Sequence, residues 1–101
     1  MKASLITPDT QSIEDIEVDS LDDLKALIGF DTLESDAVGS EVDRLYFDEE
    51  CFLRGASGRF QIDTLVPVSG KGVVLGTAGE GAELCDVTLD IEDLRRRTKF
   101  S

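Results

Sequence analysis

The apolar residues of this chain occur in short segments separated by turn residues. The longest run of Leu, Ile or Val is Val73–Leu75, whereas a membrane-spanning helix needs roughly 20 mostly apolar residues. Several segments alternate apolar and polar residues, a pattern typical of strands with one buried face, and Gly, Pro or Asp lies between them. The pattern predicts a sheet-rich fold without a membrane span, and the N-terminus does not have the pattern of a signal peptide.

Two strands are predicted at the N-terminus, over residues 2–7 and 12–18. The Pro8–Thr10 turn between them is short enough to join the two strands as an antiparallel hairpin. Ile13 is out of phase with the alternation of the second segment. We therefore expect a bulge there, or a strand that begins near Glu14.

One helix is predicted over residues 20–28. Ser20 is a good N-cap residue, acids follow in the first turn, and Gly29 is a natural residue for the position after the helix. The helical spacing of the apolar residues predicts a single stripe that faces a sheet. The residues of this stripe are Leu21, Leu24, Leu27 and Ile28.

The remaining segments complete an α+β fold. Leu, Ile, Val and Phe make up 31 of the 101 residues, enough for a folded core. We expect a mostly antiparallel, twisted sheet with one helix packed on a face and a short C-terminal helix, all in one domain over residues 1–101. The C-terminal helix would be capped by Thr88 or Asp90. Further strands are expected over 44–48, 51–54, 60–62, 73–77 and 84–89, with a short strand or extended loop within 31–40.

Acidic residues are concentrated in the first half of the chain. The chain has 22 acidic and 10 basic residues and a formal net charge of -12. Residues 9–50 hold 15 of the acids against only Lys25 and Arg44. Such a charge repels nucleic acid and anionic membranes, and it attracts basic protein surfaces. We therefore expect a basic protein surface as the partner, with no direct binding of nucleic acid or membrane.

The candidate partner-binding residues come from this acidic half. Tyr46 is included as a possible exposed aromatic anchor, although such residues more often complete a buried sheet face. The acids have two alternative explanations, solubility and adaptation to salt. The candidate residues are Asp15, Glu17, Asp19, Asp22, Asp23, Tyr46, Asp48, Glu49 and Glu50.

Composition argues against several kinds of site. The chain has no histidine, so it cannot form a Ser-His-Asp or Cys-His catalytic centre or a His-ligated metal site. The acidic clusters do not match the EF-hand pattern, so we expect no dedicated metal site, no cofactor and no catalytic residues. Cys51 and Cys85 are too few for a disulfide framework, which favours a reduced, cytoplasmic protein over one long-range disulfide.

Two other features suggest alternative functions. Glycine-rich segments at 69–72 and 76–81 are compatible with a small-ligand-binding domain, although neither has the spacing of a phosphate-binding loop. The basic stretch Arg95–Arg97 with Lys99 matches the dipole at a helix end. Alternatively, it could dock on the acidic half of a second copy and form a homodimer.

The order of several segments resembles a family of small, uncharacterised domains from phages, plasmids and conjugative elements. The resemblance rests on Pro8–Thr10, Glu17–Asp19, Leu21–Gly29, Leu45–Glu50 and Gly72–Thr77. It implies a mobile-element protein but transfers no functional residue. Together with the charge, it leads us to expect a non-enzymatic acidic protein that docks on a basic host protein, with DNA mimicry or counter-defence as possible roles.

Overall fold

The larger sheet of the molecule is antiparallel and brings the N-terminal hairpin beside the middle of the chain. The computed structural model describes residues 1–38, 42–53, 58–78 and 83–100. Within these ranges the strand order is β2-β1-β7-β4-β3, and β8 pairs with β7 beyond the end of β1. The strands are β1 (Lys2–Thr7), β2 (Ser12–Glu17), β3 (Leu33–Ala37), β4 (Asp43–Asp48), β7 (Gly72–Ala78) and β8 (Glu83–Cys85).

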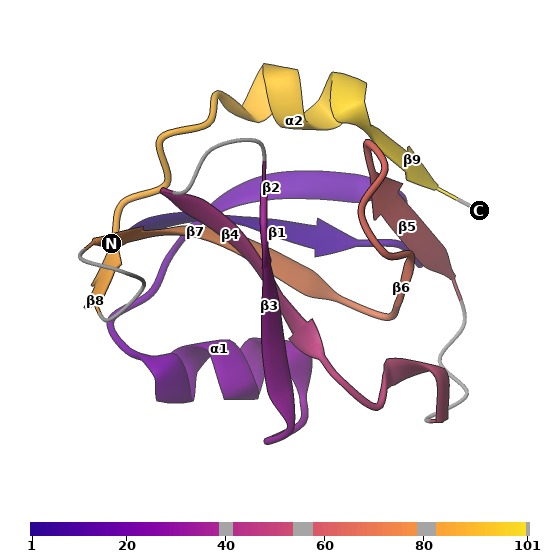
Figure 1. Cartoon of the computed structure of the whole chain (residues 1–101), viewed down its shortest axis with the longest axis horizontal. Coiled ribbons are helices and arrows are strands. Elements are labelled where there is room, and N and C mark those ends of the chain that lie inside the picture. Colours follow the sequence, from indigo (N-terminus) through magenta and orange to yellow (C-terminus); the bar gives the residue numbers. More distant parts are fainter. Residues whose placement is uncertain (39–41, 54–57, 79–82, 101) are drawn as a thin grey trace.

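A smaller antiparallel sheet and two helices cover the larger sheet (Figure 1). The smaller sheet has the order β6-β5-β9. Helix α2 leads directly into β9, so the C-terminus returns to pair with β5. The elements are α1 (Leu21–Ile28), β5 (Arg59–Ile62), β6 (Val68–Ser69), α2 (Ile91–Arg97) and β9 (Thr98–Phe100). The predicted α+β class with a mostly antiparallel sheet is therefore confirmed.

The large sheet is buried on both faces. One core cluster lies on the face shared with α2 and the smaller sheet, and it includes Ile6, Leu45 and Phe60. The other lies on the face covered by α1 and includes Leu24, Tyr46 and Val73. Figure 1 shows this layering, with α1 on one side of the large sheet and α2 on the other.

Burial on both faces explains the phase break at Ile13. Strand β2 pairs with β1 at every position from Lys2↔Glu17 to Thr7↔Ser12, so the expected bulge or late start is wrong. Ile13 lies opposite Ile6, and both belong to the α2-side core. Ile16 lies opposite Ala3 on the α1-side core. Apolar residues of both phases are therefore needed in the same strand.

Helix α1 forms where the sequence predicts it, but its capping differs. The Ser20 side chain makes no capping hydrogen bond. Instead the backbone N–H of Asp19 donates to Asp23 Oδ2 at 2.7 Å, so an acid in the first turn holds the helix entrance. Gly29 ends the helix in the left-handed conformation, with φ 94°, and its N–H donates to the Lys25 carbonyl.

The predicted apolar stripe of α1 is correct except at its first residue. Leu24 and Ile28 are buried and Leu27 is half-buried in the α1-side core, whereas Leu21 is 45% exposed. Leu21 is the first helical residue, and the core at the helix entrance is filled by Val18, which is 2% exposed. The expectation that Leu21 faces the sheet is therefore wrong.

Two segments differ from the predicted elements, and a third matches one of its two predicted alternatives. Cys51–Leu53 forms one turn of 3-10 helix rather than a returning strand, and Arg54 lies outside the described residues. The predicted strand over 84–89 is shortened to β8. The 31–40 segment contains β3, the strand option of the two considered.

A buried carboxylate joins β4 to the segment before α2. Asp43 is 2% exposed and accepts hydrogen bonds from the Thr88 backbone N–H at 2.8 Å and from Thr88 Oγ1 at 2.7 Å. The next residues lead to Asp90, which caps α2 by accepting from the Glu92 N–H at 3.0 Å. This link fixes the 86–91 segment against the sheet.

In the described part of the chain, no helix is long and apolar enough to cross a membrane.

Candidate functional site

The structure places seven of the nine candidate partner-binding residues in two separate regions and buries the other two. Asp15, Glu17, Asp19, Asp22 and Asp23 run from the edge strand β2 into the start of α1. Glu49 and Glu50 follow β4, where the Glu49 N–H donates to the Thr32 carbonyl at 2.7 Å. Because α1 has eight residues, its two ends lie about 12 Å apart. The acidic half therefore does not form one compact surface.

Tyr46 and Asp48 are buried, so they do not belong to an exposed binding surface. Tyr46 is 9% exposed within the α1-side core, which corrects its interpretation as an exposed anchor. Asp48 is 3% exposed and accepts hydrogen bonds from Thr32 Oγ1 and, at 3.1 Å, from the Glu50 N–H. These contacts give Asp48 a structural role at the end of β4.

Strand β2 is an edge strand with backbone groups that face outward. The Met1 amino group donates to the Val18 carbonyl at 2.7 Å, and the Val18 N–H donates back to Met1 at 2.9 Å. In an antiparallel ladder, residue pairs that exchange two hydrogen bonds alternate with pairs that exchange none. Because Val18 belongs to a hydrogen-bonded pair, the N–H and C=O groups of Glu17, Asp15 and Ile13 point away from β1. Arg95 covers one of them by donating to the Ile13 carbonyl at 2.7 Å.

The outward backbone groups of Asp15 and Glu17 have no hydrogen-bond partner among the described residues. An edge strand with such unpaired groups can accept a further strand. The carboxylates of both residues are exposed, and Glu17 lies 3.4 Å from the Met1 ammonium. The open stretch of β2 therefore combines free backbone groups with negative charge.

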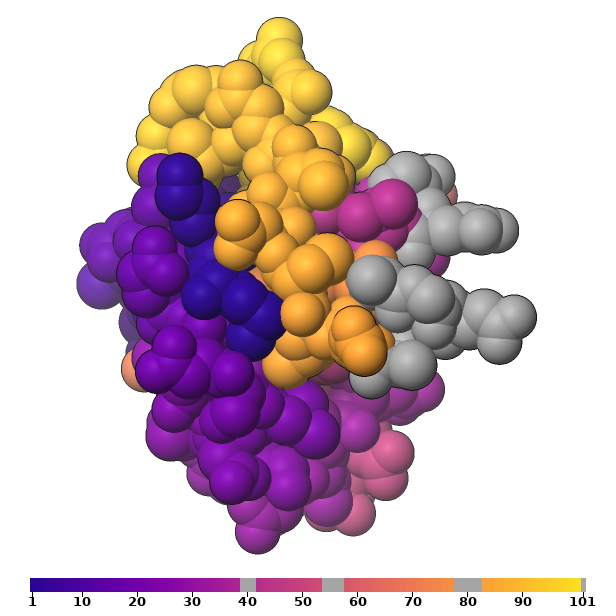
Figure 2. Space-filling view, turned by 90° about the vertical axis from the view of Figure 1, so that its left-hand side faces the viewer, coloured from indigo at the N-terminus to yellow at the C-terminus, as the bar shows by residue number. Residues whose placement is uncertain are grey.

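A hollow of about 460 Å³ lies beside this stretch of β2. Its apolar wall comes from the half-buried side chains of Val87, Leu89 and Ile91. Ile16 also lines the hollow, but its side chain packs against the α1-side core. Its other lining residues are Lys2, Asp15, Glu17 and Asp90. Figure 2 views this side of the molecule, where the indigo N-terminal residues lie between the orange 83–91 segment and the purple residues at the upper left.

Sequence reasoning found Asp15 and Glu17 but missed the other wall of this hollow. Val87 and Leu89 alternate with polar residues in the strand predicted over 84–89, and Ile91 follows in the predicted C-terminal helix. In the structure they are only half-buried, at the margin of the α2-side core. Their alternation was the available signal, but it did not reveal that the segment runs beside β2.

A second hollow, of about 280 Å³, lies at the C-terminal end of α1. Ser69, Gly70 and Lys71, from the first glycine-rich segment, line it together with α1 and the β1–β2 turn. The second glycine-rich segment serves packing at its start, because a Cβ at Gly76 would lie 2.2 Å from the Asp86 carbonyl oxygen. Residues 79–82 lie outside the described part of the chain.

The basic stretch of α2 is engaged within its own chain. Arg95 pairs with Glu92 and Arg96 with Asp93, each across one helical turn. Arg97 reaches Asp63, with Nε donating to Oδ2 at 2.7 Å. This hydrogen bond lowers the pKa of Asp63 and raises that of Arg97. The homodimer stays a prediction.

Both cysteines are free, with Cys51 buried and Cys85 half-buried. Among the described residues, Asp, Glu and Cys side chains do not gather in groups of three or more that could hold a metal ion.

No protein-family profile, curated protein or solved structure matches this chain. The resemblance to mobile-element domains therefore stays a prediction.

Proposed function

We propose that this chain is a non-enzymatic, acidic protein-binding domain whose β2 edge receives an extended, basic segment of another protein. The observation that carries the proposal is the open stretch of β2 at Asp15 and Glu17. There, backbone groups that have no partner in the described ranges occur together with two exposed carboxylates and an apolar hollow.

An added strand would use each of these features. Its backbone would bond to the outward N–H and C=O groups of β2, as in other complexes formed by strand addition. Because side chains alternate along a strand, residues on one face would enter the hollow between β2 and the 87–91 segment. Lys or Arg side chains of the partner would pair with Asp15 and Glu17.

The charge of the whole chain favours a basic partner over other polymers. A net charge of -12 speeds the approach of a positively charged protein and opposes nucleic acid. The acids at Asp19 and Asp22, which are exposed next to β2, extend this field. The two free cysteines support a reducing compartment such as the cytoplasm.

The resemblance to mobile-element domains suggests a more specific class of partner for this chain. The partner would then be a basic host protein, such as one that binds nucleic acid or acts in defence. Because the candidate acids divide between the β2–α1 side and the turn after β4, we favour capture of one extended segment over imitation of a DNA duplex.

The proposal is tested by capturing partners with three baits: the native chain, an Asp15→Lys/Glu17→Lys variant and a Glu34→Lys/Glu49→Lys variant. The second pair is the matched control, since Glu34 and Glu49 are exposed at the opposite edge of the sheet. That edge is four strand spacings away, about 19 Å. Each lysine replaces an acid, so both variants change the formal net charge from -12 to -8.

The native and control baits should retain the same basic protein, the β2 variant should lose it, and salt should release it. Equal capture by the two variants would show that the acids act only through net charge or solubility. Capture that does not depend on salt would also contradict the proposal, because charge pairs at an exposed edge are screened by salt.

A further inference from the structure

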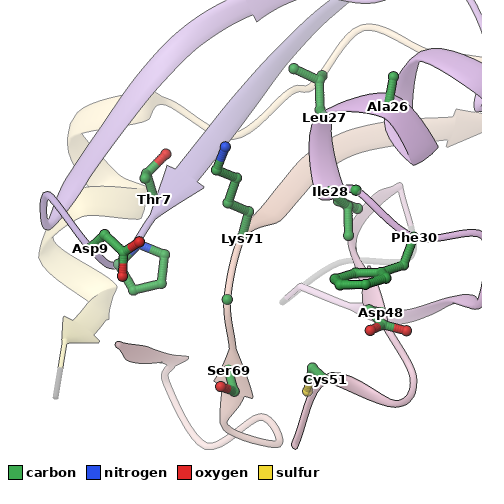
Figure 3. A pocket seen from close by; sticks show the side chains of 13 residues that line it. Thr7, Asp9, Ala26, Leu27, Ile28, Phe30, Asp48, Cys51, Ser69 and Lys71 are labelled. Carbon is green, nitrogen blue, oxygen red and sulfur yellow. The ribbon is translucent and has the colours of Figure 1, made fainter. Parts of the chain in front are cut away.

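The hollow at the end of α1 has features of a small-ligand site and lies apart from the β2 edge. It has a volume of about 280 Å³, close to the lower end of the range for ligand pockets. Leu27, Ile28 and Phe30 line one side, and Pro8 and Cys51 line the others. Figure 3 shows these walls coming from α1, the β1–β2 turn, the segment after β4 and the 69–71 segment.

Lys71 is the only cationic side chain among the lining residues. It is exposed, and its ammonium has no ion pair or hydrogen bond with any residue in the described ranges. In Figure 3 its side chain stands between Thr7 and the helix residues Leu27 and Ile28. In a chain of net charge -12, a lysine beside an apolar hollow that has no acidic partner among the described residues calls for a functional explanation.

The other polar lining residues restrict the charge of a ligand. Asp48 is buried and accepts hydrogen bonds from Thr32 and Glu50, and Asp9 is exposed at the rim. One ammonium compensates one negative charge, whereas a second negative charge would be repelled by these carboxylates. The hydroxyl groups of Thr7 and Ser69 add neutral hydrogen-bonding groups to the lining.

We infer that this hollow binds a small organic carboxylate, with its apolar body against Leu27, Ile28 and Phe30 and its carboxylate on the Lys71 ammonium. The competing structural explanation is that Lys71 only offsets the negative end of the α1 dipole. The two explanations differ in whether binding of an anion depends on Lys71. This inference is independent of the β2 edge.

Binding is tested by titrating the full chain with benzoate, benzamide and phenyl phosphate while following backbone amide shifts by NMR. Benzamide has nearly the same shape as benzoate without its charge, and phenyl phosphate carries more charge. Benzoate should shift the amides of Leu27, Gly29 and Lys71, and it should bind more tightly than either analogue. Isovalerate serves as a second, aliphatic carboxylate.

Two variants locate the site. Lys71→Met keeps the apolar stem but removes the ammonium that holds the carboxylate, so it should weaken benzoate binding at least about tenfold, equivalent to about 1.4 kcal/mol. It should change benzamide binding much less. Ala26→Phe places a large side chain at an exposed lining position and should block both ligands without disturbing the core. Lys99→Met, an exposed lysine outside the lining, is the control of equal charge.

Three results would overturn the inference. The first is that neither benzoate nor isovalerate binds at millimolar concentration. The second is that benzoate affinity is the same in the native chain and in Lys71→Met. The third is that shifts occur away from the hollow and persist in Ala26→Phe. Spectra of each variant without ligand show whether the fold is retained.

Discussion

Tyr46 reports directly on the α1-side core because it is the only tyrosine and the chain has no tryptophan. Burial raises its pKa above the ordinary value of 10.0, and the positive charge of nearby Arg44 opposes this shift only in part. The unfolded chain therefore ionises first as the pH rises through 10. From that pH upward the folded state loses stability.

We expect the phenolate absorbance of the folded chain to titrate with a midpoint above that of the chain in denaturant. Tyr46→Phe is the control and should remove the signal completely. A folded midpoint equal to or below the denatured one would mean that the ring is exposed and the α1-side core is wrongly placed.

The Asp63–Arg97 pair predicts a pH dependence of the opposite kind. The hydrogen bond from Arg97 lowers the pKa of Asp63, while burial and the charge of Arg97 have smaller effects. A lowered folded pKa stabilises the fold above the unfolded carboxyl pKa of about 3.8, and this contribution is lost as the pH falls through the folded pKa. Because Asp63 is 42% exposed, solvent screening keeps the effect small.

Asp63→Asn should therefore lower the free energy of unfolding at neutral pH and make no difference in acid below the folded pKa. Asn suits this position because Asp63 has φ 50°, a conformation that Asn also tolerates. The measurement is denaturant unfolding of both proteins across the acid range. A deficit that is equal at every pH would show that the ion pair is not its cause.

At the scale of elements, α1 provides a direct comparison of two leucines on one helix. Leu24 is fully buried, so Leu24→Ala should reduce the free energy of unfolding by about 2–5 kcal/mol. Leu21 is 45% exposed, so Leu21→Ala should cost less than about 1 kcal/mol. Similar losses in denaturant unfolding would show that the helix is rotated from its position in this structure.

Gly76 shows why a strand inside the sheet contains a glycine. A Cβ at this position would lie 2.2 Å from the Asp86 carbonyl oxygen and 3.0 Å from Cys85 Sγ, so β7 and the segment after β8 could not keep their spacing. We expect Gly76→Ala to destabilise the fold by at least about 1–3 kcal/mol in denaturant unfolding. No loss would mean that this segment does not pack on β7.

Local patterns predicted the elements whose neighbours in the sheet are close in sequence. The β1–β2 hairpin, α1 and β4 follow from alternation, helical spacing and turn residues. Strand β9 was missed because it begins directly after α2 without a turn residue and pairs with β5, where Phe100 lies opposite Phe60. Local residue patterns do not encode a pairing at that separation.

The candidate site was predictable only in part for the same reason. The acids of β2 and of the α1 start were recognised by their charge. The burial of Asp48 depends on Thr32, which β3 brings beside the end of β4. The apolar wall at Val87 and Leu89 depends on the 86–91 segment running beside β1 and β2, where the Val87 N–H donates to the Lys2 carbonyl at 2.8 Å.

At the scale of the whole molecule, the fold divides the negative charge between the two edges of one sheet. Both β2 and β3 carry exposed acids, and charged edge strands are also a general protection against aggregation. What distinguishes β2 is its open backbone beside an apolar hollow. At each edge an arginine covers one outward carbonyl, Arg95 at Ile13 of β2 and Arg44 at Ser35 of β3, so the hollow is the difference between the two edges. The β2 edge is therefore the proposed binding site, and the β3 edge serves as its internal control.

The most direct measurement is amide hydrogen exchange at Asp15 and Glu17, with and without the basic segment of a captured partner. If that segment adds to β2 as a strand, these two outward N–H groups become hydrogen-bonded and their exchange should slow at least about tenfold, equivalent to about 1.4 kcal/mol. Exchange at Ala37, on the opposite edge, should not change. Unchanged exchange at Asp15 and Glu17 in the complex, or protection at Ala37 instead, would contradict binding at the β2 edge.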